Sequence, residues 1–130
     1  MANKYATFGK EFTKNLGEYN YCEVSVKHRK AGFNYFNGNY EEAGVEVCVT
    51  PVTRKVENGI VSTSFMVFQS PGFRVLVDPM TRFNQKKFDA IVEQTKAILD
   101  KVTHFMEEGL TAVAAQFIMQ NVGSAKKKVA

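Results

Sequence analysis

The residues best suited to bind a ligand form one short stretch in which basic and aromatic side chains are interleaved. Glycine and asparagine separate the aromatic residues, and rings in such a segment are costly to leave in water unless something covers them. Stacking of a nucleobase on an aromatic side chain contributes about 1–3 kcal/mol, and nearby cations neutralise backbone phosphates. The stretch therefore predicts contacts to an unpaired nucleic-acid strand. The residues assigned to these contacts are Lys27, Arg29, Lys30, Phe33, Tyr35, Phe36 and Tyr40.

Three more basic residues extend this predicted track. Arg54 and Lys55 precede a turn, and Arg74 alternates with apolar neighbours, which directs it away from a core. Acidic residues on the same face would repel phosphate. Those close to the track are Glu23, Glu41, Glu42, Glu46 and Glu57. For the aromatic rings a second interpretation also stays open, in which they fold back over the sheet as ordinary core.

Motifs of known catalytic sites are absent from the sequence, which contains neither a glycine-rich phosphate loop nor a nucleophile elbow. His28 lies in the apolar row of a predicted strand, where a hydrogen-bonded structural histidine is the favoured interpretation. Asp78, which precedes a proline, is typical of a capped turn. We therefore expect no enzymatic activity, no cofactor and no metal.

Length and composition indicate one globular domain. The chain has 130 residues, of which 45% are hydrophobic and 23% are charged. A formal net charge of +4 and a pI near 9.1 suit a polyanionic partner. No stretch approaches the run of about 18 apolar residues typical of a membrane helix. Cys22 and Cys48 do not form a metal-type pair, so we expect reduced core thiols, a cytoplasmic location and no membrane partner.

Alternating polar and apolar residues predict four strands in an antiparallel meander. Pro51 implies an edge, a bulge or a bend within the second strand. Asn58 and Gly59 predict a type I′ hairpin turn between the second and third strands. The predicted strands cover residues 21–29, 45–56, 60–69 and 73–77. A short helix is expected near the N-terminus from the spacing of Tyr5, Phe8, Phe12 and Leu16.

A long amphipathic helix is predicted after the strands, with Asn84 as its cap and an end near Glu107. Gly109 interrupts the pattern, and a short helix over residues 110–118 is unusually apolar on all sides. That helix packs either onto the sheet or against another subunit. The fold class expected is α+β: a four-stranded antiparallel meander sheet followed by the long and the short helix. One domain covers residues 1–122, and residues 123–130 form a basic tail.

The order of four antiparallel strands and a long helix resembles the Whirly and transcriptional-coactivator-type single-stranded DNA-binding proteins. Residues 73–78 and 82–84 are similar to the family's last strand, short polar crossing and helix start. The resemblance covers residues 21–107 and implies a homo-oligomer, a dimer or tetramer, with DNA lying across its sheet faces. Small members of this type are encoded by phages, which implies a role in DNA replication or recombination in the host cytoplasm.

We therefore expect a non-enzymatic, largely sequence-independent single-stranded DNA-binding protein. The main alternative is a small structural or accessory protein that binds another protein through the aromatic segment and the C-terminal helix, since aromatic residues are enriched at protein interfaces too. A small-ligand protein or an enzyme would need convergent polar groups that the sequence does not reveal. Binding to duplex DNA or to RNA suits the charge equally well.

Overall fold

The computed structural model describes residues 5–15, 18–65 and 72–123 of the chain. Within these residues an antiparallel sheet and three helices confirm the predicted α+β class. The strands are β1 (Tyr5–Asn15), β2 (Glu18–Arg29), β3 (Gly32–Asn34), β4 (Asn39–Glu41), β5 (Gly44–Glu57), β6 (Ile60–Phe65) and β7 (Phe73–Asp78). The helices are α1 (Gln85–Ala97), α2 (Leu99–Glu107) and α3 (Thr111–Asn121).

The main sheet has five strands and forks along one side of β5. β1, β2, β5 and β6 follow one another across it, while β7 also pairs with β5 rather than with β6. Val45–Val49 of β5 pair with β7, and Val52–Glu57 pair with β6. The prediction of a simple meander is therefore wrong for the last strand. On this side of β5, Pro51 lies between the two paired stretches and has no ladder partner in β6 or β7.

The N-terminal segment is a strand and not the short helix expected from its aromatic spacing. β1 pairs antiparallel with β2 and occupies an edge of the sheet. Ala6, Phe8 and Phe12 are separated by even numbers of residues, which places them on one face of a strand, and they pack against the core. The strand periodicity of their apolar side chains therefore outweighs the helical spacing. Leu16, the last residue of the expected helix, lies outside the described residues, as do residues 66–69 of the predicted third strand and residues 124–130 of the predicted tail.

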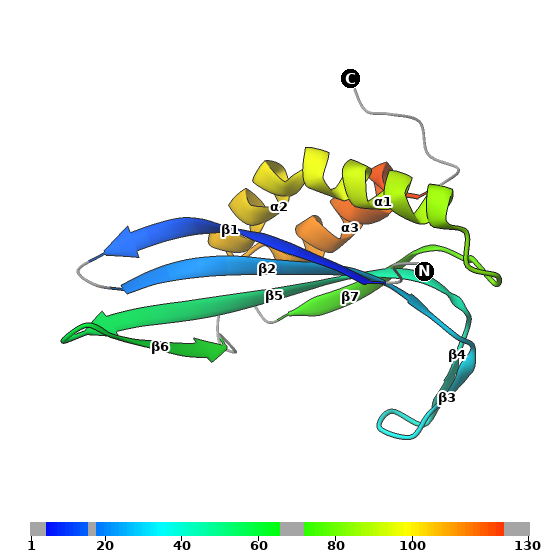
Figure 1. The fold of residues 1–130 in the computed structure, drawn as a ribbon, viewed down its shortest axis with the longest axis horizontal. Coiled ribbons are helices and arrows are strands. Elements are labelled where there is room, and N and C mark those ends of the chain that lie inside the picture. The colour runs from blue at the N-terminus through cyan, green and yellow to red at the C-terminus, as the bar shows by residue number, and fades with distance from the viewer. Residues whose placement is uncertain (1–4, 16–17, 66–71, 124–130) are drawn as a thin grey trace.

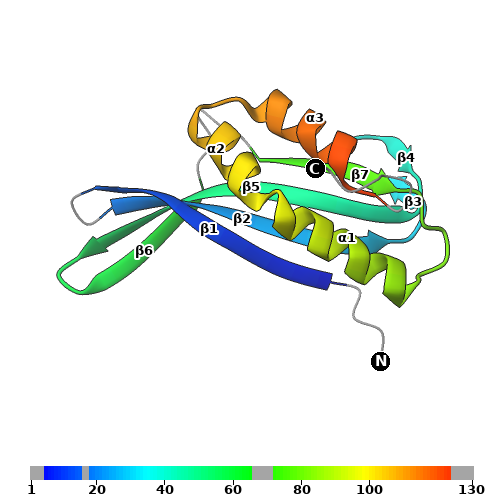
Figure 2. The ribbon, with the colours of Figure 1, turned by 90° about the horizontal axis from the view of Figure 1, so that it is seen from above.

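All three helices cover the same face of the sheet, as Figure 1 and Figure 2 show from two directions. The amide oxygen of Asn84 accepts a hydrogen bond from the Lys87 N–H at 3.0 Å, which confirms the predicted cap. The predicted long helix is divided at Ile98, where φ and ψ are −106° and 8°. α3 follows Gly109, whose φ is +76°, and packs against β7.

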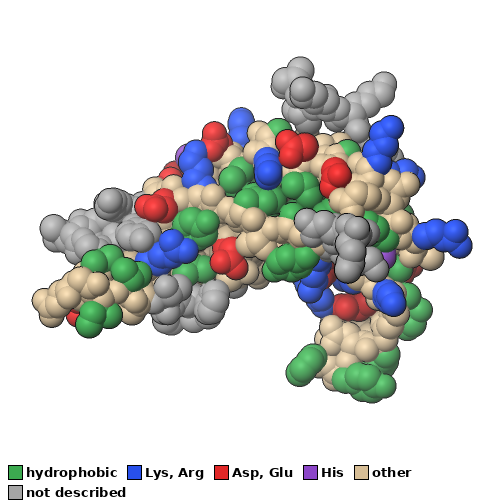
Figure 3. All heavy atoms as spheres, in the orientation of Figure 1, with side chains coloured by type: hydrophobic (Ala, Val, Ile, Leu, Met, Phe, Trp, Pro, Cys, Tyr) green, Lys and Arg blue, Asp and Glu red, His purple; other side chains and the backbone are tan. Residues whose placement is uncertain are grey.

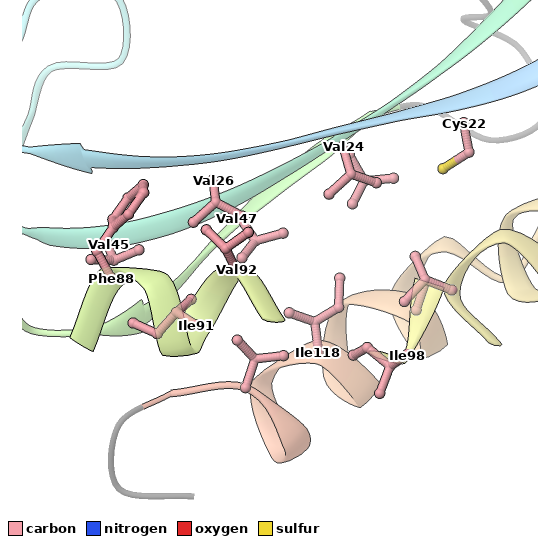
Figure 4. Packing of buried hydrophobic residues seen from close by; sticks show 14 of the residues in the cluster. Cys22, Val24, Val26, Val45, Val47, Phe88, Ile91, Val92, Ile98 and Ile118 are labelled. Atoms are coloured by element: carbon pink, nitrogen blue, oxygen red, sulfur yellow. The ribbon is translucent and has the colours of Figure 1, made fainter. Parts of the chain in front are cut away.

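The core lies between the helices and the strands. Figure 4 shows apolar side chains of β2 and β5, such as Val24 and Val47, pointing towards Phe88, Ile91 and Ile118 of the helices. Cys22 belongs to this core, as predicted, and is fully buried. Cys48 does not, because strand alternation directs it to the opposite face, where it is half-buried.

The short strands β3 and β4 form a separate two-stranded hairpin that projects from the sheet on the side away from the helices (Figure 1). It carries the predicted aromatic segment. The other predicted hairpin turn is confirmed, because Asn58 and Gly59 have φ values of 51° and 79°. Among the described residues, no helix has the length and hydropathy needed to cross a membrane.

Candidate functional site

The sheet face opposite the helices, called the open face below, gathers most of the predicted basic residues. Since Val24, Val26, Val45 and Val47 point into the core, the residues between them point the other way. β7 contributes Arg74, which is paired with Cys48 across the ladder. The polar residues of the open face in β2, β5 and β7 are Glu23, Ser25, Lys27, Arg29, Glu46, Cys48, Thr50, Arg54 and Arg74.

The β3–β4 hairpin presents its aromatic side chains to solvent. Tyr35 and Phe36 at its tip are 90% and 103% exposed, and Phe33 and Tyr40 are 48% and 70% exposed. The rings of Phe33 and Tyr35 lie against each other, with centroids 4.9 Å apart. The alternative in which these residues form ordinary core is therefore wrong for the described chain, because the hairpin leaves the sheet instead of folding onto it.

Local hydrogen bonds give the hairpin tip a defined shape. The side-chain oxygen of Asn34 accepts from the Phe36 N–H at 2.9 Å, and its backbone oxygen accepts from the Gly38 N–H at 2.8 Å. The side-chain oxygen of Asn37 accepts from the Asn39 N–H at 2.9 Å. Gly38 has a φ of +73°, a conformation that glycine adopts without strain. The rings are thus held on a structured turn.

Two arginines of the open face attach the hairpin to the sheet. Arg29 donates from Nε to the backbone oxygen of Glu42 at 2.8 Å. Arg74 donates from Nη2 to Oε2 of Glu41, and the side-chain amide of Asn34 donates to the same oxygen at 3.3 Å. Charge-assisted bonds of this kind are stronger than neutral ones. The aromatic tip therefore has a fixed relation to the basic residues of the sheet.

A buried carboxylate organises these cations. Glu46 is only 1% exposed, and its Oε2 lies 2.8 Å from Nη1 of Arg29 and 3.7 Å from Nη1 of Arg74. Its Oε1 lies 3.5 Å from Nζ of Lys27. A buried carboxylate needs such partners, because burial without them costs several kcal/mol. Glu46 thus holds the three cations together under the hairpin.

Between the hairpin and the open face lies a pocket of about 380 Å³. Aromatic side chains form its outer wall, and the charged side chains form its floor. Figure 3 shows apolar side chains at the end of the hairpin, with basic and acidic side chains next to each other where it joins the sheet. Four basic and two acidic residues line the pocket, which leaves two net positive charges. The lining residues are Lys27, Arg29, Lys30, Gly32, Phe33, Asn34, Tyr35, Phe36, Glu41, Glu46 and Arg74.

The environment alters two pKa values at this site. Partial desolvation raises the pKa of Glu41, but the hydrogen bond from Asn34 and the charges of Arg74 and Arg29 outweigh it, so the net pKa is lowered. Burial raises the pKa of the Cys48 thiol, with a further contribution from the nearby Glu46 carboxylate. At neutral pH Glu41 is ionised and Cys48 carries its proton.

The structure brings together seven of the ten predicted site residues, because Lys27, Arg29, Lys30, Phe33, Tyr35, Phe36 and Arg74 all line the pocket. Tyr40 is on the same hairpin but does not line it. Arg54 shares the open face and lies 4.4 Å from the ring centroid of Tyr21. It is eight residues from Glu46 along β5, a separation of roughly 26 Å.

Lys55 is not part of this surface. It alternates with Arg54 to the other side of the sheet, where its Nζ lies 3.4 Å from Glu57. Glu41 and Glu46 share the surface with the cations, where acidic residues were expected to oppose phosphate. Sequence reasoning treated them only as repulsive. One feature of the sequence does indicate a paired carboxylate. Glu46 interrupts a run of valines, and a single charged residue in a buried strand usually has partners.

The structure also shows the surroundings of His28 and of the potential metal ligands. His28 shares a hydrogen bond of 2.8 Å between Nε2 and the backbone oxygen of Met80, and its ring meets Phe83 edge-on at 5.4 Å. This agrees with a structural histidine. Among residues 5–15, 18–65 and 72–123, no group of three or more potential metal ligands is found.

Comparisons with models of protein families, with characterised proteins and with solved structures find no match for this chain.

Proposed function

We propose that this protein is a non-enzymatic single-stranded DNA-binding protein of low sequence dependence, with a role in DNA replication or recombination. The β3–β4 hairpin stacks with unpaired bases, and the basic residues of the open face contact the backbone. The observation that carries the proposal is the exposure of four aromatic side chains on one structured hairpin beside a pocket of positive net charge.

Stacking supplies most of the affinity in this proposal. Each base stacked on an aromatic side chain contributes about 1–3 kcal/mol, whatever its identity. The side chains of Tyr35 and Phe36 are almost fully exposed, and the hydrogen bonds of the tip already fix their backbone. A prearranged surface loses less conformational entropy on binding than a loop that has to become ordered.

The electrostatic contribution is smaller than the number of basic residues suggests. Lys27 and Arg74 are about two-fifths exposed at their side chains, so part of each faces outward towards a phosphate. Glu46 and Glu41 cancel part of their charge. Because each neutralised phosphate releases counterions, the affinity should depend on salt, but only moderately.

Self-association through α3 belongs to the same proposal. α3 has no charged residue, although it lies on the surface. Leu110 before it and Val113 and Met119 within it are 45%, 42% and 51% exposed. Exposed apolar side chains on an uncharged helix are common at interfaces. A homo-oligomer would place several aromatic hairpins along one strand and raise the overall affinity.

A titration of fluorescently labelled oligo-dT, followed by anisotropy at two salt concentrations, tests the proposal. We expect saturable binding that weakens as salt rises, and unlabelled single strands should compete better than duplex DNA. Absence of binding at low salt would contradict the proposal. Stronger competition by duplex DNA would also contradict it, because stacking on the hairpin requires unpaired bases.

The second candidate is an accessory protein that binds another protein through the hairpin and α3. Exposed aromatic side chains favour it too, since Tyr and Phe are enriched at protein interfaces. The two candidates differ in one measurable respect. A protein-binding hairpin predicts no salt-dependent affinity for oligonucleotides.

A further inference from the structure

The pocket under the hairpin combines a stacking wall with a floor that both donates and accepts hydrogen bonds. A surface that binds only the phosphate backbone needs cations alone. Here Glu41 and Glu46 lie among the cations, and both line the pocket. Carboxylates in such a place have acceptor capacity that a phosphate cannot use, because both groups are anionic acceptors.

Each of the two carboxylates has one oxygen with few partners. Oε2 of Glu41 accepts from Arg74 and Asn34, whereas its Oε1, among the described residues, has only an ion pair with Arg29, at 3.9 Å. Oε1 of Glu46 is buried and accepts no hydrogen bond within the part of the chain that the structure describes. Buried acceptors are normally paired, and the ammonium of Lys27, 3.5 Å from this oxygen, takes that role, so the acceptor left open to a ligand is Oε1 of Glu41.

The wall of the pocket selects a flat ligand. Phe33 and Tyr35 already contact each other, and Phe36 lines the pocket beside them. Gly32, at the start of β3, also lines the pocket and has open space where a Cβ would be. A volume of about 380 Å³ is near the lower end of small-molecule sites, which suits one base rather than several.

We propose that this pocket receives one unpaired base of the bound strand and prefers guanine, an inference that rests on the proposed single-strand binding. The edge of guanine places the N1–H and N2–H donors beside the O6 acceptor. Glu41 Oε1 accepts from these donors, and a cation of the floor, Arg29 or Arg74, donates to O6. Its two fused rings, like those of adenine, also stack over a larger area than a pyrimidine.

The other bases match the floor less well. Thymine has a single ring N–H between two carbonyl oxygens, so one of those oxygens approaches the carboxylate. Adenine has no carbonyl oxygen to accept from the cations. Cytosine presents an N4–H donor beside its acceptors, but on a smaller ring, and ranks second. The remaining bases of the strand stack on the hairpin without selection.

Four labelled strands test this inference: a short oligo-dT and three versions in which the central dT is replaced by dG, dC or dA. We expect the strand with dG to bind about tenfold more tightly than oligo-dT, which is the discrimination expected from one well-formed base contact. Equal affinities for the four strands, with the salt dependence retained, would overturn the inference and leave the proposed function standing. Binding of none of the strands would overturn both.

Glu41→Gln tests the assigned carboxylate. It should bring the ratio of the dG and dT affinities close to one, while binding of oligo-dT is kept or strengthened by the loss of a negative charge. Glu42→Gln is the matched control, because Glu42 is an exposed neighbour that does not line the pocket. It removes the same charge and should leave the ratio unchanged. An unchanged ratio in Glu41→Gln would overturn the assignment.

Discussion

At the scale of single residues, the site depends on the neighbours of the basic residues. Glu46 is buried and is paired with Lys27, Arg29 and Arg74, so these side chains do not extend freely into solvent. An unpaired buried charge would be costly, which is why replacing Glu46 should destabilise the sheet as well as the site. The sequence shows how many cations are present but not which of them a carboxylate holds.

The position of Lys27 predicts the salt dependence of its substitution. Lys27→Ala should reduce the slope of log affinity against log salt by about 0.7, the value for one phosphate contact on a single strand. Lys55→Ala removes the same charge from the other side of the sheet and should leave the slope unchanged. Anisotropy titrations over a salt series measure both. Equal effects of the two substitutions would contradict the placement of the site.

The two thiols should differ in reactivity. Burial raises the pKa of Cys22 to about 12, while Cys48 is half-buried on the open face. The reactive species is the thiolate, so alkylation at pH 8 should modify Cys48 long before Cys22, as peptide mass spectrometry would show. If Cys22 reacts first in the folded protein, the assignment of the two sheet faces is wrong.

The raised pKa of Cys22 also gives stability a pH dependence. The unfolded thiol loses its proton near pH 9, but the folded one keeps it to about pH 12. The unfolded state therefore binds fewer protons above pH 9, and this contribution to stability, intact below pH 9, is lost as the pH rises towards 12. The melting temperature should fall more steeply above pH 9 for the wild type than for Cys22→Ala.

At the scale of elements, the sequence predicts most of the strands and helices because their patterns are local. The alternation in β2 and the Asn84 cap need no knowledge of the rest of the chain. β1 and the pairing of β7 with β5 are different, because the choice between strand and helix for Tyr5–Asn15 depends on a free edge of β2. Pairing with β2 determines that β1 is a strand, and pairing with β5 determines the position of β7; neither can be read from a local pattern.

Close approach of β5 and β7 predicts the effect of a glycine substitution. A Cβ at Gly44 would clash with the backbone oxygen of Asp78 and lie 3.3 Å from Cα of Pro79. Backbone atoms cannot move aside easily, so Gly44→Ala should destabilise the protein by about 1–3 kcal/mol. Gly32→Ala meets nothing within 4 Å and should leave stability nearly unchanged. Urea denaturation measures both, and equal stabilities would contradict the packing of these strands.

At the scale of the whole molecule, the helices occupy one face of the sheet and the aromatic hairpin projects from the other (Figure 1). Sequence reasoning identified seven of the residues that line the pocket, because basic and aromatic side chains are adjacent in the chain. It did not reveal the pocket. That feature arises only when the hairpin, β5 and β7 bring Phe33, Glu46 and Arg74 to one place.

The uncharged surface of α3 predicts the state of assembly. If the proposed self-association through α3 holds, wild-type protein should have the mass of a dimer or tetramer at micromolar concentration, because a second copy would cover exposed apolar side chains such as Val113 and Met119. The double substitution Val113→Lys and Met119→Lys should shift the protein towards monomer. Ala97→Lys, on the exposed side of α1, is the control. A monomeric wild type in light scattering would contradict this part of the account.

Photo-crosslinking of a single strand that contains bromouracil tests the central claim most directly. Trypsin releases residues 31–54 as one peptide, because no lysine or arginine lies between Lys30 and Arg54, and this peptide carries all four aromatic residues of the hairpin segment. We predict that mass spectrometry finds the crosslinked nucleotide on this peptide, at Phe33, Tyr35, Phe36 or Tyr40. Crosslinks confined to the helices, with this peptide unmodified, would contradict the account.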